Sequence, residues 1–385
     1  MRNLFLLNPG IVFLNHGSFG ACPREVFDAW VGWQREMEGN PVEFLGRRSA
    51  ALLLEARIAL AEFTGAKAAD LVFVPNATHA VNTVARSLAF EPGDEILTTD
   101  HEYGACDNTW AFVCRRTGAR LVRARIPLPY RPEEFLQRIF DQVTARTRIL
   151  FLSHITSTTA LIFPVAEVCV RARELGLLTL VDGAHAPGQI PLDLEAIGAD
   201  FYTGNCHKWL CAPKGSAFLH ARREHQALLD APVVSWGYSD TAGGHTGFEA
   251  YTGETVLERR LQWQGTRDLA TFLTVPAAIA FQRSHHWDEV RARCHTLAEE
   301  TLKRSCGMFG LEPPCGDGDF AQMVCLPVPP REPETLRRTL FERFRIEVPV
   351  TTHQNQIFVR ISVQGYNTPE DLDRLLEALM QVYRA

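Results

Sequence analysis

The sequence predicts an α/β fold, in which a mostly parallel, mixed sheet is flanked by helices and followed by a smaller C-terminal α+β domain. The first observation is that short β-branched or apolar runs alternate with helical patterns through the middle of the chain. Such alternation is typical of βαβ units, whose parallel sheet is buried on both faces. The second observation is a change of pattern from about residue 275, where a long helical stretch precedes short strands.

The expected sheet takes its strands from seven short runs. These runs cover 70–76, 94–100, 119–126, 147–155, 177–185, 199–209 and 215–221. Helical patterns over 77–90, 101–118, 132–143 and 165–176 lie between them, and the last of these patterns ends at a glycine.

The C-terminal part is expected to begin with one long helix over 277–305. Strands over 321–328 and 358–364 and a final amphipathic helix from 369 complete it. We therefore expect an N-terminal segment, 1–20, that docks on the rest, a large domain over 21–272 and a small domain over 273–385.

Composition excludes several classes of function. The chain has 385 residues, a formal net charge of −6 and no basic cluster interleaved with aromatic residues, so nucleic acid is not the expected partner. No run approaches the ~18 apolar residues of a membrane span. The apolar N-terminus is interrupted at 8–10 and does not read as a signal peptide. Ten cysteines without C-x-x-C spacing indicate free thiols in the cytoplasm.

Lysine is scarce. Of the 39 basic residues, only Lys67, Lys208, Lys214 and Lys303 are lysines. Arginine stays protonated and cannot act as an amine nucleophile, whereas a desolvated lysine can form a Schiff base. A solvent-exposed loop lysine is the ordinary alternative. Lys208 lies in a mostly uncharged, apolar stretch, TGNCHKWLCAPKG, which favours a depressed pKa and a reactive amine.

Polar residues follow five of the expected strands at the point where each strand ends. They are found at 76–79, 101, 154–157, 182–185 and 207–208. Ligands of α/β sheets bind beyond the carboxyl ends of the strands. The sequence therefore predicts one ligand site at this edge.

Two features of this edge suit a phosphorylated, nitrogen-containing cofactor. Asp182 ends a strongly apolar strand, where it either caps the next loop or pairs with a protonated pyridine nitrogen. Ala77 and Thr78 begin a helix, whose free N–H groups and dipole, with the Thr78 hydroxyl, favour an anion. An ordinary helix cap explains the second feature equally well.

Six motifs in order and register resemble the class V aminotransferase family of pyridoxal-phosphate enzymes. They are DHEYGA, SHITSTTALIFPV, VDGAHAPGQ, TGNCHKW, QGTRD and VRISVQGYNT, and the resemblance covers about residues 12–370. LNHGSFGACP and TTDHEYGA are similar to the isopenicillin N epimerase-like branch. The resemblance implies the fold-type I architecture and pyridoxal 5′-phosphate as cofactor, with no metal.

The resemblance also implies roles around the cofactor. Lys208 matches the lysine that forms the Schiff base, Asp182 the partner of the pyridinium, and His101 the residue that stacks on the ring. His185 matches the residue near the phenolic oxygen. Ser157 stands where many relatives have an asparagine that contacts this oxygen, so its role departs from the pattern.

Phosphate and substrate positions are implied in the same way. The phosphate contacts are Ala77, Thr78, Thr203, His207 and, from a second subunit, Thr266, so an active site at a homodimer interface is expected. Arg360 matches the arginine that binds a substrate α-carboxylate, for which its bidentate fork is suited. By motif position, His16, Tyr103 and His207 are candidates for a second proton donor, and His16 and Tyr103 for substrate contacts.

The substrate is expected to be a small amino acid, and three outcomes at its Cα stay open. Reprotonation at Cα gives epimerisation, reprotonation at the cofactor carbon gives transamination, and loss of a β-substituent gives C–S lyase chemistry. A desulfurase that works through a persulfide is disfavoured, because the region before Arg360 lacks a cysteine. A non-catalytic protein of the same fold is a remote alternative.

Overall fold

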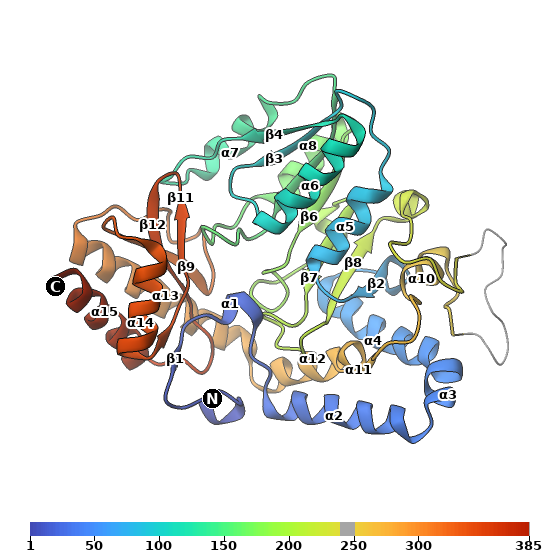
Figure 1. Cartoon of the computed structure of the whole chain (residues 1–385), viewed down its shortest axis with the longest axis horizontal. Coiled ribbons are helices and arrows are strands. Elements are labelled where there is room, and N and C mark those ends of the chain that lie inside the picture. Colours follow the sequence, from blue (N-terminus) through green and yellow to red (C-terminus); the bar gives the residue numbers. More distant parts are fainter. Residues whose placement is uncertain (239–250, 385) are drawn as a thin grey trace.

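The computed structural model describes residues 1–238 and 251–384. A seven-stranded mixed sheet forms the centre of the molecule (Figure 1). Its strands are β2 (Leu71–Val74), β3 (Glu95–Thr99), β4 (Arg120–Ala124), β5 (Thr147–Ser153), β6 (Leu178–Asp182), β7 (Phe201–Asn205) and β8 (Ala217–Ala221).

The strand order is β2-β8-β7-β6-β5-β3-β4. β8 runs antiparallel to both of its neighbours, and the other pairs of neighbouring strands are parallel. This mostly parallel, mixed sheet confirms the predicted fold class, and all seven predicted strands are present.

Successive side chains of each strand point to opposite faces of the sheet, and both faces are buried in an apolar core. Leu150 and Leu152 of β5 belong to one apolar core, and Ile149 and Phe151 belong to another. The first core is closed by α4 (Ser49–Thr64), α7 (Pro132–Phe140) and α8 (Val165–Glu174), and the second by α5 (Ala77–Ser87), α6 (Gly104–Thr117) and α10 (Val256–Leu261). This double burial explains why the strands are apolar along their whole length.

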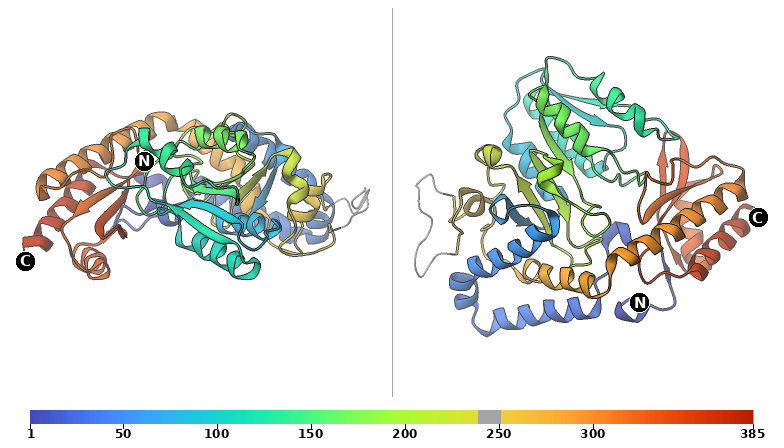
Figure 2. Two further views of the ribbon diagram at one scale, coloured as in Figure 1. Left: turned by 90° about the horizontal axis from the view of Figure 1, so that it is seen from above. Right: turned by 180° about the vertical axis from the view of Figure 1, so that it is seen from behind.

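A second, antiparallel sheet lies at one end of the molecule (Figure 2). It has the order β11-β12-β9, with β9 (Met323–Val328), β11 (Val350–His353) and β12 (Gln356–Ser362). The helix α13 (Trp287–Phe309) packs on β9 and α14 (Pro333–Phe344) on β11, and α15 (Pro369–Arg384) packs on both of these helices.

The long helix expected over 277–305 is two helices. α12 (Val275–Ser284) ends before His286, and α13 begins after it. His286 has a φ of 49°, in the left-handed region, which interrupts the helix. The periodicity of apolar residues continues across the break, so the sequence pattern did not predict it.

The N-terminal segment joins the two sheets. β1 (Val12–Phe13) pairs in parallel with β10 (Ile346–Glu347), and Leu14 bonds through its backbone to Glu347 and Ser362. α1 (His16–Phe19) then reaches the end of the large sheet. The remaining elements are α2 (Arg24–Gly39), α3 (Pro41–Glu43), η2 (Phe44–Arg48), η3 (Ala68–Asp70), α9 (Leu194–Ile197), η4 (Arg223–Leu228), α11 (Ala270–Leu273) and, before β1, η1 (Arg2–Leu4).

Among the described residues, no helix combines the length and the apolar character needed to cross a membrane.

Candidate active site

A cavity of about 310 Å³ opens at the carboxyl ends of the parallel strands. Its walls come from α1 and from the segments that follow β2, β3, β5, β6 and β7. The predicted edge of polar residues is therefore one site. Eight predicted site residues line it: Ala77, Thr78, Tyr103, Ser157, Asp182, His185, His207 and Lys208.

Lys208 lies in the turn after β7 and lines the cavity. Burial, and next the charge of Arg360, lower the pKa of its amine to about 8. Its Nζ lies 3.1 Å from Nε2 of His185. With a pKa near 8, about a tenth of the amine is uncharged at pH 7, so Lys208 has the chemistry of a nucleophile and base.

Asp182 ends β6 and is buried at the cavity wall. Oδ1 accepts a hydrogen bond of 2.9 Å from the amide of Ala184, and Oδ2 accepts a weak one of 3.5 Å from Sγ of Cys106. Burial raises the pKa of the carboxyl above its ordinary value. A buried carboxylate with so little compensation favours a cationic ligand group in the cavity.

The first turn of α5 offers donors to an anion. The amide of Ala77 is bonded to Oδ1 of Asn205 at 2.9 Å, and the amide of His79 to Oδ1 of Asn76 at 2.8 Å. Thr78 lines the cavity, and its amide and hydroxyl have no hydrogen-bond partner within residues 1–238 and 251–384. Thr78 thus supplies two free donors at a helix N-terminus, while the Ala77 amide is already engaged.

Arg360 lies behind the cavity wall rather than in it. Nη1 donates to the carbonyl oxygen of Ser157 and, at 3.2 Å, to its Oγ, and Nη2 donates to Oγ of Ser18 at 3.3 Å. Ser18 and Ser157 both line the cavity. Nε of Arg360 is buried without a partner among the described residues. The guanidinium therefore sits directly beside the cavity with bonding capacity to spare.

His16 was expected to contact substrate and does not line the cavity. Its ring is fully buried, with Nε2 donating to the carbonyl oxygen of Lys208 at 3.0 Å and Nδ1 accepting from the Tyr366 hydroxyl at 3.0 Å. Burial lowers the pKa of His16 to about 3. A neutral ring with both nitrogens engaged holds the lysine loop in place, and it is not available as a proton donor.

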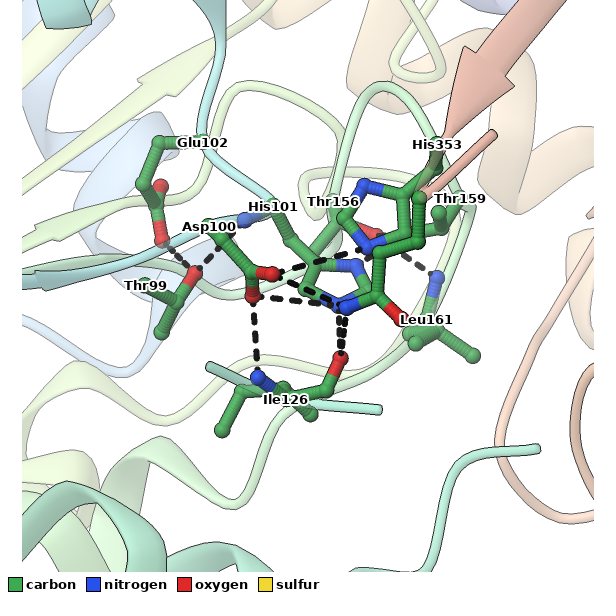
Figure 3. A network of polar contacts seen from close by, with 10 residues as sticks. Thr99, Asp100, His101, Glu102, Ile126, Thr156, Thr159, Leu161 and His353 are labelled. Atoms are coloured by element: carbon green, nitrogen blue, oxygen red, sulfur yellow. Dashed lines mark hydrogen bonds and ion pairs between the residues drawn. The ribbon is translucent and has the colours of Figure 1, made fainter. Parts of the chain in front are cut away.

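His101 was expected to stack on the cofactor ring, but it lies in a network of polar contacts outside the cavity lining (Figure 3). Its Nε2 donates to the carbonyl oxygen of Ile126 at 2.7 Å, and Nδ1 accepts from Oγ1 of Thr159 at 2.7 Å. The ring packs against His353 at a centroid distance of 3.9 Å and is absent from the cavity lining. Stacking on a ligand ring does not fit this position. Tyr103, two residues later, lines the cavity instead.

Asp100, His101 and His353 each offer an atom within 4.8 Å of the others, an arrangement that could hold a metal ion. Nε2 of His101 is already committed to Ile126, so an ion there would have to displace this hydrogen bond.

Two predicted phosphate contacts are not in the cavity. Thr203 lies within β7 and donates its hydroxyl to the carbonyl oxygen of Phe218 at 2.7 Å, so its predicted contact does not fit. Thr266 is exposed on the surface, and its predicted role, in a second subunit, stays a prediction. His207 lines the cavity. Its Nδ1 donates to the carbonyl oxygen of Ser216, and burial lowers the pKa of its ring to about 4.

Among the residues of the site that were not predicted are three that form its hydrogen bonds. Ser18 and Asn205 line the cavity, and Glu102 is buried beside it. Oε2 of Glu102 accepts from the amide and the hydroxyl of Ser153, and burial raises its pKa to about 8. All three lie inside motifs of the sequence, LNHGSFGACP, TGNCHKW and DHEYGA, and their places in these motifs could have indicated them.

A profile of the aminotransferase class-V family matches residues 12–375. The chain belongs to the class-V aminotransferase family. It is an enzyme that depends on pyridoxal 5′-phosphate, as members of this family do. This confirms the resemblance and the predicted cofactor.

Relatives within the family differ in activity. The chain is 40% identical to isopenicillin N epimerase of Amycolatopsis lactamdurans, over 99% of this chain and 97% of that one. It is 31% identical to putative L-cysteine desulfhydrase 1 of Oryza sativa, over 96% of this chain and 83% of that one.

Solved structures share the fold. A complex of the cystine C–S lyase C-DES with its product cysteine persulfide has a TM-score of 0.81 at 21% identity, covering 96% of this chain and 97% of that one. Cysteine desulfurase from Thermococcus onnurineus has a TM-score of 0.81 at 19% identity, covering 100% and 97%.

The cavity fits the family's cofactor. Lys208 offers an amine of lowered pKa, Asp182 a buried carboxylate short of partners, and Thr78 two free donors at a helix N-terminus. These are the groups that would hold an aldehyde, a protonated pyridine and a phosphate, respectively.

Proposed function

We propose that this enzyme epimerises an amino acid at Cα. The observation that carries the proposal is that an amine of lowered pKa, Lys208, and a phenol, Tyr103, line the same cavity, beside which Arg360 lies. Inversion at Cα needs one group to take the proton and another to return it. The similarity to isopenicillin N epimerases over nearly the whole chain supports this reaction over transamination.

Three residues in or beside the cavity have defined roles in the proposal. Lys208 would carry the cofactor and, once released, take the Cα proton on Nζ, while Asp182 would pair with the pyridine nitrogen. When bound, the cofactor supplies the electron sink that makes this proton acidic. Arg360 would bind the substrate α-carboxylate through its fork.

The second proton donor is Tyr103 in this proposal. Of the three candidates, His16 is excluded by its two engaged nitrogens. His207 uses its Nδ1 proton on Ser216, and its pKa of about 4 leaves Nε2 without a proton near neutral pH. Tyr103 is about half exposed and lines the cavity, and a phenolic hydroxyl can donate a proton.

A C–S lyase is the second candidate, because a desulfhydrase is a relative at 31% identity. It would not proceed through a cysteine persulfide on Cys325. That thiol is buried in β9, bonds to the Thr158 carbonyl at 3.3 Å, and has its pKa raised by burial to about 12. β-Elimination needs no such cysteine.

A homodimer in the cytoplasm is part of the proposal. The exposed position of Thr266 is compatible with a contact to the cofactor phosphate of a second subunit. All ten cysteines are free thiols, as expected of a reducing compartment.

Incubating the holoenzyme with single enantiomers of amino acids in deuterium oxide tests the reaction. We expect deuterium at Cα and formation of the opposite enantiomer without release of keto acid. Formation of a keto acid in the presence of an amino-group acceptor would show transamination instead of epimerisation. Formation of pyruvate together with sulfide or a thiol would show a C–S lyase.

A further inference from the structure

One imidazole connects Lys208 to a tryptophan that lies outside the cavity lining. Nε1 of Trp209 donates to Nδ1 of His185 at 3.3 Å, and Nε2 of the same ring lies 3.1 Å from Nζ of Lys208. Trp209 and His185 are both buried. The two nitrogens of His185 are thus shared between an indole and the reactive amine.

The direction of these hydrogen bonds follows from the chemistry of the donors. An indole N–H can only donate, so Nδ1 of His185 must accept and carries no proton. His185 is neutral, because burial and the charges of Lys208 and Arg360 hold its pKa well below the ordinary value. The single ring proton is therefore on Nε2 and points at Nζ of Lys208.

A donor at Nε2 distinguishes between the two forms of the lysine. The uncharged amine has a lone pair that accepts this hydrogen bond, whereas the ammonium offers only donors and would oppose it. The contact thus stabilises the form that reacts as a nucleophile or base.

Trp209 is held firmly enough to fix the tautomer. Its carbonyl oxygen accepts from Nε2 of Gln282 at 2.8 Å, and its indole packs on His16 at a centroid distance of 5.0 Å. Gly188 lies so close that a Cβ there would be 2.4 Å from the Trp209 carbonyl oxygen. The Trp209 backbone therefore has no room to move toward Gly188, and its side chain is fully buried.

We propose that Trp209 is a positioning residue that keeps the His185 proton on Nε2 and thereby favours the uncharged form of the Lys208 amine. The proposal rests on Lys208 being the reactive amine of the proposed function. Other charged or titratable groups act on Lys208 and His185 from neighbouring elements and stay constant in the test below: Asp182, Arg360, Cys106, His16 and His207.

Selective isotope labelling of lysine gives a direct readout, because the chain has only four lysines. Titration of the full-length apoprotein by NMR, with the Lys208 signal assigned from its loss in Lys208→Arg, yields the pKa of this amine. In Trp209→Phe, His185 can move its proton to Nδ1, so we expect the pKa of Lys208 to rise by about one unit, the size expected of one hydrogen bond.

Trp110→Phe is the matched control. Trp110 is also fully buried, but its indole nitrogen has no hydrogen-bond partner in the described chain, so this variant should leave the Lys208 pKa unchanged. In a His185→Phe background, Trp209→Phe should no longer shift it. An unchanged pKa in Trp209→Phe, or an equal shift with and without His185, would overturn the proposal.

A measurement on the unmodified protein covers the case in which Trp209→Phe does not fold. Histidine-selective NMR of the apoprotein reports which ring nitrogen of His185 is protonated, and we expect Nε2. A proton on Nδ1 would contradict the proposal. Both readouts are independent of turnover, so a positive result without Cα exchange would overturn only the proposed function, and the reverse result only the role of Trp209.

Discussion

The thiol of Cys106 donates to the carboxylate of Asp182 across 3.5 Å beneath the cavity. A thiol is a weak donor, and the Ala184 amide is the other donor to this buried carboxylate within the described part of the chain. These hydrogen bonds and the nearby charge of Lys208 compensate Asp182 only in part, since burial still raises its pKa, and we attribute its place at the end of β6 to a cation that enters the cavity.

Replacing Asp182 by Asn tests this relationship. Removing one partner of a buried ion pair costs roughly 3–5 kcal/mol, so we expect kcat to fall by about 10²-fold or more. Cys106→Ser keeps a donor to Oδ2 and should retain most activity. Steady-state kinetics of the two variants checks the expectation, and an Asp182→Asn enzyme as active as Cys106→Ser would contradict it.

Glu102 makes the stability of the apoprotein depend on pH. Burial raises its pKa from 4.5 to about 8, with the charge of Asp182 adding to the effect. Between these two values the folded state binds more protons than the unfolded state, so this group's contribution to the free energy of unfolding decreases as pH rises.

We expect Glu102→Gln to lack this decrease. Buried histidines act in the opposite direction at the acidic end, so the relevant quantity is the difference between variant and wild type. Denaturant unfolding between pH 4.5 and pH 8 should show the variant gaining stability relative to wild type as pH rises. A constant difference would refute the assignment.

Arg360 is expected to set the affinity for substrate. Charge-assisted hydrogen bonds contribute roughly 1.5–3 kcal/mol each, so loss of the guanidinium in Arg360→Ala should lower kcat/KM by about 10²-fold. Arg304→Ala, which breaks an exposed ion pair with Asp373, is the control and should be unaffected. Kinetics with an amino acid and with its amide, which lacks the carboxylate, completes the test. An equal loss for both substrates would argue against carboxylate binding.

Thr266 tests whether the active site is shared between subunits. A carboxylate at this position should repel a cofactor phosphate in the partner's site, so Thr266→Asp and Lys208→Ala are each expected to be inactive as pure dimers. Refolding the two variants together gives mixed dimers with one site free of both changes. We expect activity to return to about a quarter of the wild-type value, since half of the dimers are mixed and each has one intact site. No recovery would indicate a site built within one subunit.

The sequence was sufficient for the strands and for the edge at which the site lies, because both depend on patterns along the chain. It could not tell which side chains face the cavity. Thr203 lies within a strand, where successive side chains point to opposite faces of the sheet, and a shift of one position changes the face. His101 and Tyr103 are two residues apart in a turn, and the hydrogen bonds of His101 to Ile126 and Thr159 decide which of them enters the cavity.

Reduction of the holoenzyme with borohydride, followed by peptide mapping by mass spectrometry, identifies the lysine that carries the cofactor. We expect the phosphopyridoxyl group on Lys208, and we expect Lys214, six residues later and exposed, to be unmodified. Modification of Lys214 in place of Lys208, or of neither, would contradict this expectation.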